Sequence, residues 1–203
     1  MFNKEKLILT DCDGVLLDWM DSFSKFMLEK GHTVDPKYID KYSLAKRFNV
    51  DRNVMHDYIV EFNNSAHVSN LPPLADSVEY ISKLAKLGFR FIVISSMSNT
   101  KEAHDLRWKN LQSVYGDVFD ELILLDVGKD KYEALDCWYN TELFWIEDKF
   151  VNSLIGHAAG LQAILVDADH NQDLITSRFP RVSAETPWKE IYNYVIKDYN
   201  IVP

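Results

Sequence analysis

Short apolar runs alternate with amphipathic stretches along most of the chain. Apart from Arg90 the runs are uninterrupted, which is typical of strands buried on both faces of a sheet. They cover residues 7–9, 89–94, 122–125, 143–146 and 163–166. Between them, apolar residues recur at helical spacing over about 75–87, 100–115, 131–139, 151–159 and 188–198. Strands that alternate with helices predict an α/β fold, a Rossmann-like parallel sheet with helices on both faces.

Residues 19–72 interrupt this alternation and carry only helical patterns. The first helix is predicted to start at Trp19 and to end near Gly31, and Asp35-Pro36 opens a short helix because proline suits a first helical turn. Two more helices are predicted between residues 40 and 62, with inward-facing candidates Leu44, Phe48, Val54, Tyr58, Ile59 and Phe62. We therefore expect a core of residues 1–18 and 73–203 and a helical domain, residues 19–72, inserted after the first strand.

The composition favours a folded protein without a membrane-spanning segment. The chain has 203 residues, 47% of them hydrophobic, enough for one α/β domain with a small insert. A net charge of -9 disfavours broad binding to nucleic acid. No apolar stretch approaches the roughly 18 residues that a membrane-spanning helix needs, and we expect no signal peptide before the strand at Leu7. Cys12 and Cys137 imply no disulfide framework, so we expect a reducing, cytoplasmic setting.

Two carboxylates follow the first apolar run. Asp11 and Asp13 are two residues apart, and Gly14 then permits a sharp turn. Each carboxylate raises the proton affinity of the other unless a cation lies between them, and Mg2+ prefers such oxygen ligands. The same residues could instead mark only a strand end and a turn.

Hydroxyl and ammonium groups follow the next two strands. Ser95 and Ser96 come after the second run, where a hydroxyl can hydrogen-bond a phosphate oxygen or simply form a turn or a helix cap. Lys129 and Lys131 come after the third run, and Lys131 adjoins the predicted helix. A fixed positive charge there would stabilise a transferring phosphoryl group, whereas a surface lysine would only be solvated.

A second acidic pair, Glu147 and Asp148, follows the fourth run. The pair presents the same repulsion as Asp11 and Asp13 and would be relieved by the same cation, although it could also be a charge pair at a helix N-terminus. In open α/β sheets, sites form outside the carboxyl ends of the strands. We therefore expect these residues to converge.

The stretch from Asp11 to Asp18 resembles the first motif of the haloacid dehalogenase superfamily, Asp-x-Asp-Gly-(Thr or Val)-Leu-x-Asp. The second motif of that superfamily is matched by Ser95 or by its neighbour Ser96. The third motif is matched by Lys131, which is preferred over Lys129. The fourth motif is matched by the pair Glu147-Asp148. The resemblance covers about residues 5–18 and 74–170, and the insert has the location and size of the C1-type cap of that family.

The resemblance implies a role for each matched residue. Asp11 would be the nucleophile that forms an aspartyl-phosphate, and Asp13 the general acid and base. Ser95 and Lys131 would hold the phosphoryl oxygens. The metal would be Mg2+, with ligands from the Asp148 carboxylate, Glu147 through water, the Asp11 carboxylate and the Asp13 carbonyl, while Asn152 would support the site. Cys12, between the two aspartates, is interpreted as a packing residue.

The activity implied is Mg2+-dependent hydrolysis of a small phosphomonoester. The aromatic residue after Asp18 and the stretch Leu71-Pro72-Pro73-Leu74 are similar to the 5'(3')-deoxyribonucleotidase group, which suggests a (deoxy)nucleotide. Aromatic side chains of the cap could contact a base, but packing inside the cap is the favoured role for most of Trp19, Phe23, Phe26, Phe62 and His67. The alternatives are a phosphatase for nucleic-acid 3'-phosphate ends, a phosphomutase, and a non-catalytic metal-binding or partner-binding module.

The remaining polar segments suggest no further site. The other histidines (His32, His56, His104, His157 and His170) lack metal-ligand spacing. Residues 169–187 are predicted to form a polar loop, with Arg178 and Arg181 as ordinary surface charges. Oligomeric state is left open by the sequence.

Overall fold

A single parallel sheet organises the chain in a computed structural model that describes residues 5–202. The strands follow the order β3-β2-β1-β4-β5-β6, and every neighbouring pair is parallel. Their bounds are β1 Leu7–Thr10, β2 Arg90–Ser96, β3 Phe119–Leu125, β4 Phe144–Glu147, β5 Gln162–Val166 and β6 Arg181–Val182. The Rossmann-like α/β fold expected from the apolar runs is confirmed.

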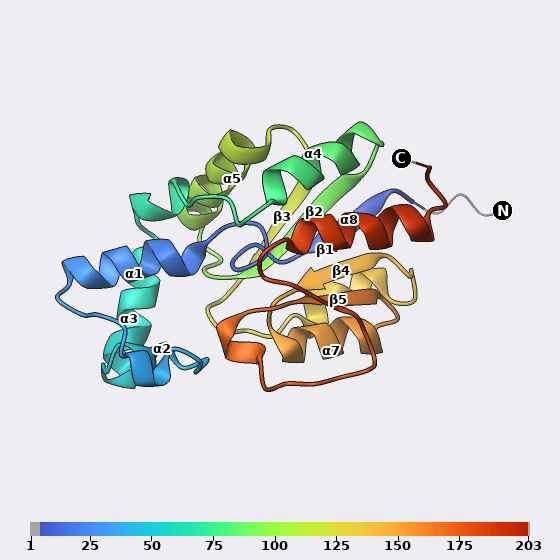
Figure 1. Ribbon diagram of the computed structural model, residues 1–203. Helices are drawn as coiled ribbons and strands as arrows, with labels where there is room; N and C mark the ends of the chain where they lie inside the picture. Colours follow the sequence, from blue (N-terminus) through green and yellow to red (C-terminus); the bar gives the residue numbers. More distant parts are fainter. Residues whose placement is uncertain (1–4, 203) are drawn as a thin grey trace.

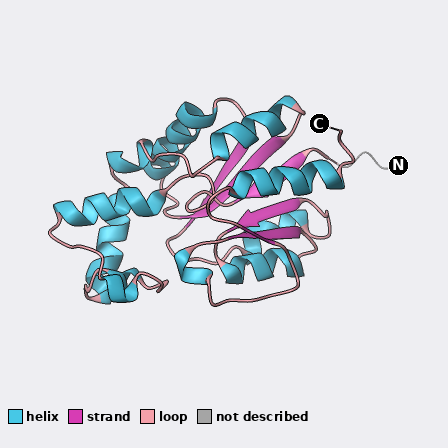
Figure 2. Cartoon of the chain, viewed as in Figure 1, coloured by secondary structure: helices cyan, strands magenta, loops and turns pink. Residues whose placement is uncertain are grey.

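Helices cover both faces of the sheet (Figures 1 and 2). One face carries α4 (Ser77–Lys86), α5 (Lys101–Tyr115) and α8 (Pro187–Asp198), and the other carries α6 (Tyr132–Leu135) and α7 (Phe150–Ala158). Two apolar layers result: Phe91, Phe119 and Trp188 belong to the first, and Ile94, Trp145 and Leu165 to the second. The central strands are largely apolar because both of their faces are covered.

The segment between β1 and α4 forms three helices that lie together beside the sheet (Figure 1). They are α1 (Trp19–Glu29), α2 (Leu44–Arg47) and α3 (Arg52–Asn63), with 3-10 turns at Pro36–Tyr38 and Ala66–Ser69. The chain leaves and returns at one place, because the Asp18 amide donates to the Pro72 carbonyl at 2.9 Å. The division into a core of residues 1–18 and 73–203 and a cap of residues 19–72 stays a prediction.

Aromatic packing holds this helical segment together. Phe23, Phe26 and Phe62 are buried, and Trp19 stacks on Phe23 with ring centroids 4.4 Å apart. His67 stacks on Phe62. Packing inside the segment, the role favoured for most of these residues from the sequence, is therefore what the structure has.

Some predicted elements were wrong in extent. Strand β3 begins at Phe119 rather than at residue 122, because its exposed Asp120 and Glu121 hide the edge strand from an apolar search. The helix expected over residues 131–139 is one turn, α6, followed by a 3-10 turn at Asp136–Trp138. The loop expected over residues 169–187 contains a 3-10 turn at Asp169–Asn171 and the two-residue strand β6. In the helical segment after β1, Val54, expected to face inward, is exposed.

The strand order reverses between β1 and β4, because β2 and β3 extend the sheet to one side of β1 and β4 and β5 to the other. A crevice forms at the carboxyl ends of strands at such a reversal. The fold therefore directs the residues that follow β1, β2 and β4 to one place. Among the described residues, no helix has the length and apolar character needed to cross a membrane.

Candidate active site

Polar residues from four strand ends line one cavity of about 1670 Å³. Asp11 and Asp13 come from β1, Ser95 from β2, Lys131 from the connection after β3, and Asp148 from β4. Residues of the helical segment, including Trp19 and Arg47, line its other side. The convergence expected from the strand-end residues is therefore present in the fold.

The turn after β1 brings the first motif close to Asp148. The Asp11 amide donates to the Ile146 carbonyl at 2.8 Å, which ties the end of β1 to β4. Gly14 has a φ of +79°, and a Cβ placed there would lie 2.4 Å from Asp148 Oδ2. Glycine is thus required twice at this position, for its backbone angle and for the approach of a carboxylate.

Lys131 is a buried ammonium group held between two carboxylates. Its Nζ lies 2.8 Å from Asp11 Oδ1 and 2.9 Å from Glu147 Oε2. Burial lowers the pKa of Lys131, but Asp11 and Glu147 outweigh burial, so its pKa is raised and the side chain stays charged. Lys129 instead pairs with Glu133 on the surface. The structure thus brings Lys131, and not Lys129, to the site.

Glu147 holds Lys131 and the backbone after β4 in place. Its side chain is fully buried at the end of β4. Oε1 accepts from the amides of Asp148 and Lys149 at 3.1 and 2.9 Å, while Oε2 accepts from Lys131. Both oxygens therefore orient neighbouring groups, and a metal contact of Glu147 through water stays a prediction.

The hydroxyl groups after β2 have different partners. Ser95 Oγ lies 3.4 Å from Asp13 Oδ2, whereas Ser96 Oγ donates to the Lys129 carbonyl at 2.7 Å. Ser95 is therefore the hydroxyl that contacts Asp13. Asn152 is buried on α7 at the cavity wall, and its Oδ1 has no hydrogen-bond partner among residues 5–202.

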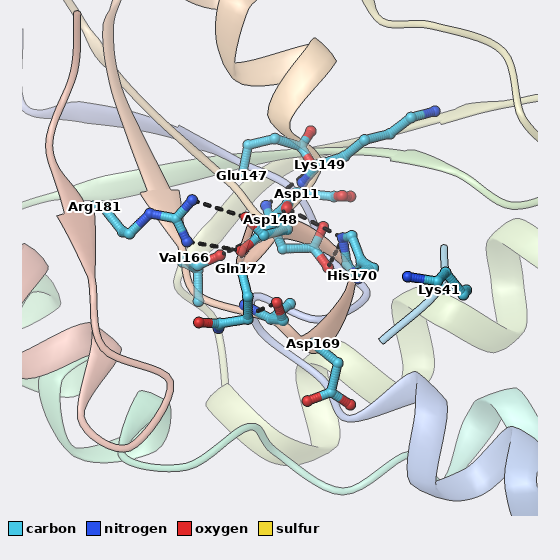
Figure 3. Close-up of polar contacts among 12 residues, drawn as sticks. Asp11, Lys41, Glu147, Asp148, Lys149, Val166, Asp169, His170, Gln172 and Arg181 are labelled. Atoms are coloured by element: carbon cyan, nitrogen blue, oxygen red, sulfur yellow. Dashed lines mark hydrogen bonds and ion pairs between the residues drawn. The ribbon is translucent and has the colours of Figure 1, made fainter. Parts of the chain in front are cut away.

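The loop after β5 braces Asp148 from the other side (Figure 3). Asn171 Nδ2 donates to the Asp148 carbonyl at 2.7 Å, and His170 Nε2 lies 3.2 Å from the same carbonyl oxygen. Arg181 binds this loop through Asn171 and also pairs with Asp167. Arg181 is thus not an ordinary surface charge, and the sequence analysis missed this brace because the bonds join residues of no recognisable spacing.

The acidic groups fit a hard divalent cation. Oxygen atoms of Asp11, Glu147 and Asp148 all lie within 4.8 Å of one another. Burial and the nearby Glu147 raise the pKa of Asp11 from 3.8 to about 7, and burial and the nearby Asp11 raise the pKa of Asp148 to about 7. Burial makes the charged form of both carboxylates unfavourable, and a bound cation that prefers oxygen ligands would stabilise that form. Asp11 and Asp148 are the ligands that this geometry favours.

Arg107 is a charged residue near the site that the sequence analysis missed. It lies on α5, is fully buried, and its Nη1 is 2.7 Å from Asp13 Oδ1. The helix repeat places it on the buried face with Ala103 and Leu111, four residues away on either side. An arginine at an inward position of an amphipathic helix was the available signal.

Comparisons with known proteins give one weak sequence relative and many similar structures. No family model matches the chain. A 32.4 kDa protein of Enterobacteria phage T4 from the Gp30-rIII intergenic region, described as uncharacterized, is 29% identical over 134 residues, which are 62% of this chain and 47% of the phage protein. The chain thus spans about half the length of that relative.

Three solved structures illustrate the structural likeness. A haloacid dehalogenase-like hydrolase from Streptococcus pneumoniae has a TM-score of 0.67 at 15% identity, covering 96% of this chain and 100% of that one. A HAD family hydrolase from Deinococcus radiodurans with bound phosphate and sodium has a TM-score of 0.63 at 16% identity and covers 98% of both chains. CbbY from Rhodobacter sphaeroides, in complex with phosphate, has a TM-score of 0.60 at 15% identity over 90% and 96%.

The chain has the haloacid dehalogenase-like fold. Within that fold, the five residues that the resemblance matched to the motifs at the cavity, Asp11, Asp13, Ser95, Lys131 and Asp148, lie together. Glu147, also matched, lies beneath them. The fold and the positions of these residues do not by themselves assign a chemical role to any of them.

Proposed function

We propose that this protein is a Mg2+-dependent phosphomonoester hydrolase that acts through an aspartyl-phosphate intermediate. The observation that carries the proposal is the meeting of Asp11 and Asp148, from two neighbouring strands, beside the buried Lys131 ammonium. A carboxylate nucleophile, a cation site and a fixed positive charge are the parts that phosphoryl transfer by a haloacid dehalogenase-like fold would need. The phosphate bound in two of the similar structures supports the same ligand chemistry here.

In the proposed reaction, an Asp11 carboxylate oxygen attacks phosphorus and forms a P–O bond, while the P–O bond to the ester oxygen breaks. The ester oxygen keeps the electron pair and takes a proton from Asp13, which releases the alcohol. Asp13 then accepts a proton from water, whose oxygen attacks phosphorus and displaces Asp11 as a carboxylate, giving inorganic phosphate. Mg2+, held by Asp11, Asp148 and the Asp13 carbonyl, would offset charge on the phosphoryl oxygens when bound.

Lys131 and Ser95 complete the proposed phosphate site. The ammonium of Lys131 lies at the nucleophile and reduces repulsion between the Asp11 carboxylate and a phosphate dianion. The Ser95 hydroxyl, 3.4 Å from Asp13, can donate to a phosphoryl oxygen. These groups are held in place before substrate arrives, because Lys131 is paired twice and buried.

The proposed substrate is a small phosphorylated metabolite such as a (deoxy)nucleotide. The cavity extends from Asp11 to the helical segment, where Trp19, Tyr38 and Tyr42 line it and offer aromatic faces. The net charge of -9 supports a small substrate over a polynucleotide. We propose that the helical segment acts as a C1-type cap and that the protein works in a reducing, cytoplasmic setting, where the buried Cys12 beside the nucleophile stays a thiol.

Turnover of p-nitrophenyl phosphate with and without Mg2+ tests the proposal. We expect metal-dependent release of p-nitrophenol, and a fall of at least about a thousandfold in Asp11→Asn with the fold retained, because asparagine keeps the shape but is no nucleophile. Absence of turnover with every metal and every phosphomonoester in a nucleotide-rich panel would favour a binding module. Activity retained in Asp11→Asn would remove the nucleophile assignment.

A further inference from the structure

Arg107 and Asp13 form a buried ion pair that joins α5 to the turn after β1. Arg107 is fully buried, and Asp13 Oδ1 is buried although the Asp13 side chain as a whole is 23% exposed and lines the cavity. The atoms are 2.7 Å apart and form an ion pair. One oxygen of Asp13 thus faces a fixed charge inside the protein, while Oδ2 is the oxygen beside Ser95.

The other contacts of the guanidinium are soft and weak. Nε donates to Met97 Sδ at 3.3 Å and Nη1 to Cys12 Sγ at 3.5 Å, and Nη2 has no hydrogen-bond partner within residues 5–202. Asp13 is therefore the carboxylate that compensates this buried charge among those residues. A buried ion pair of this kind adds little net stability compared with an apolar pair of similar volume. Stability alone is a poor reason for an arginine here.

We propose that Arg107 is a positioning residue for Asp13: it fixes Oδ1 from inside the fold so that Oδ2 is presented to the leaving oxygen of the substrate. This inference rests on the proposed function. Arg107 lines no part of the cavity in the described structure, so it acts through Asp13 and not on the substrate itself. Its own position is fixed by α5 and by Met97, whose carbonyl accepts from Asn63 of the helical segment at 2.9 Å.

The proton step that depends on Asp13 gives a specific test. When the P–O bond to the ester oxygen breaks, an alkoxide must take the Asp13 proton, whereas p-nitrophenolate is a stable anion that leaves without it. The ratio kcat/KM covers the steps up to departure of the alcohol, so it isolates this event from the later attack of water. We therefore compare kcat/KM for a deoxynucleoside 5'-monophosphate with that for p-nitrophenyl phosphate.

For Arg107→Met, we expect kcat/KM on the nucleotide to fall about 100-fold and kcat/KM on p-nitrophenyl phosphate to fall less than about tenfold. Arg107→Lys should recover part of the loss because it keeps the charge. In an Asp13→Asn background, Arg107→Met should cause no further loss, since both changes remove the same proton transfer. Lys109→Met, an exposed change on the same helix, is the control and should leave both values unchanged.

Equal losses on the two substrates, or a further loss in the Asp13→Asn background, would overturn the positioning role and leave Arg107 as a packing residue. If Arg107→Met does not fold, Arg107→Gln, which keeps a polar head group, is compared in the same way. Wild-type protein is assayed first, so that absence of any Mg2+-dependent turnover counts against the proposed function and not against Arg107 alone.

Discussion

Gly14 and Asp148 show how closely two distant parts of the chain meet at the scale of single residues. A methyl group on residue 14 would lie 2.4 Å from Asp148 Oδ2, a distance at which one of the two groups must move. Asp148 is the carboxylate that the geometry favours as a metal ligand together with Asp11. The lack of a side chain at Gly14 therefore allows the Asp148 carboxylate to occupy its position.

Gly14→Ala tests this relation against a matched control. Gly31 also has a positive φ, of +85°, but an added Cβ there would meet no atom within 4 Å among the described residues. Both changes strain the backbone by about 1 kcal/mol, and the contact with Asp148 adds a further cost in Gly14→Ala alone. Only Gly14→Ala should weaken activation by Mg2+, by about tenfold or more, because only it displaces Asp148.

The Mg2+ concentration for half-maximal activity of Gly14→Ala and Gly31→Ala provides the measurement. An equal Mg2+ requirement in both variants would show that Asp148 moves aside without loss, and would weaken its assignment as a ligand.

Residue-scale prediction from the sequence worked where side chains followed a recognisable strand. Asp11, Asp13, Ser95 and Asp148 all follow apolar runs, and parallel strands bring their carboxyl ends to one edge. Arg107 escaped because the sequence analysis did not assign an inward face to the helix over residues 100–115, although Arg107 lies four residues from both Ala103 and Leu111. The site partners of Asp148 on the β5 loop escaped because loop conformation has no period.

At the scale of elements, the connection between β3 and α6 decides which lysine enters the site. Lys131 is the residue before the first turn of α6, and from this position its side chain reaches the buried carboxylates of Asp11 and Glu147. Lys129, two residues earlier, pairs with Glu133 at the surface. The spacing of two residues separates a buried cation from a solvated one.

Lys131→Met should therefore be severely destabilising. It removes the cation between two buried carboxylates, and breaking a buried ion pair in this way costs about 3–5 kcal/mol. Lys129→Met is the matched control on the same connection and should leave the urea midpoint unchanged, since an exposed ion pair adds little. Urea unfolding followed by tryptophan fluorescence gives the two midpoints. Similar midpoints for the two variants would contradict the buried pairing of Lys131.

Strands were easier to predict than the short elements, for a physical reason. Strands β1, β2, β4 and β5 are buried on both faces, and each contains an apolar run of at least three residues. Strand β6 has two residues and α6 has four, too few to show any period. The edge strand β3 carries exposed acidic residues, which suit an edge but conceal its start.

At the scale of the whole molecule, the sheet buries the carboxyl groups of Asp11 and Asp148, and burial makes their charged forms unfavourable. Asp11 and Asp148 have pKa values raised from 3.8 to about 7, so the folded protein holds protons that the unfolded chain has released. The stability that these two groups contribute is present below their ordinary pKa and is lost as the pH rises through about 7. The metal-free protein therefore retains its carboxylate cluster at a cost that grows with pH.

A bound cation reverses that trend, which gives the last prediction. Protons compete with Mg2+ for Asp11 and Asp148 below about pH 7 and so weaken Mg2+ binding there. At one fixed Mg2+ concentration, the rise in unfolding temperature should therefore be small near about pH 5.5 and large near about pH 8.5. If that concentration is a hundredfold above the dissociation constant at the higher pH, the added stability there is about 2.7 kcal/mol. Thermal unfolding with and without Mg2+ across this range is the measurement, and Asp148→Asn, which removes a charged ligand, should flatten the pH dependence. An equal effect of Mg2+ at both pH values would mean that the ion binds away from these carboxylates, and the meeting of β1 and β4 would then lack the chemical role proposed for it.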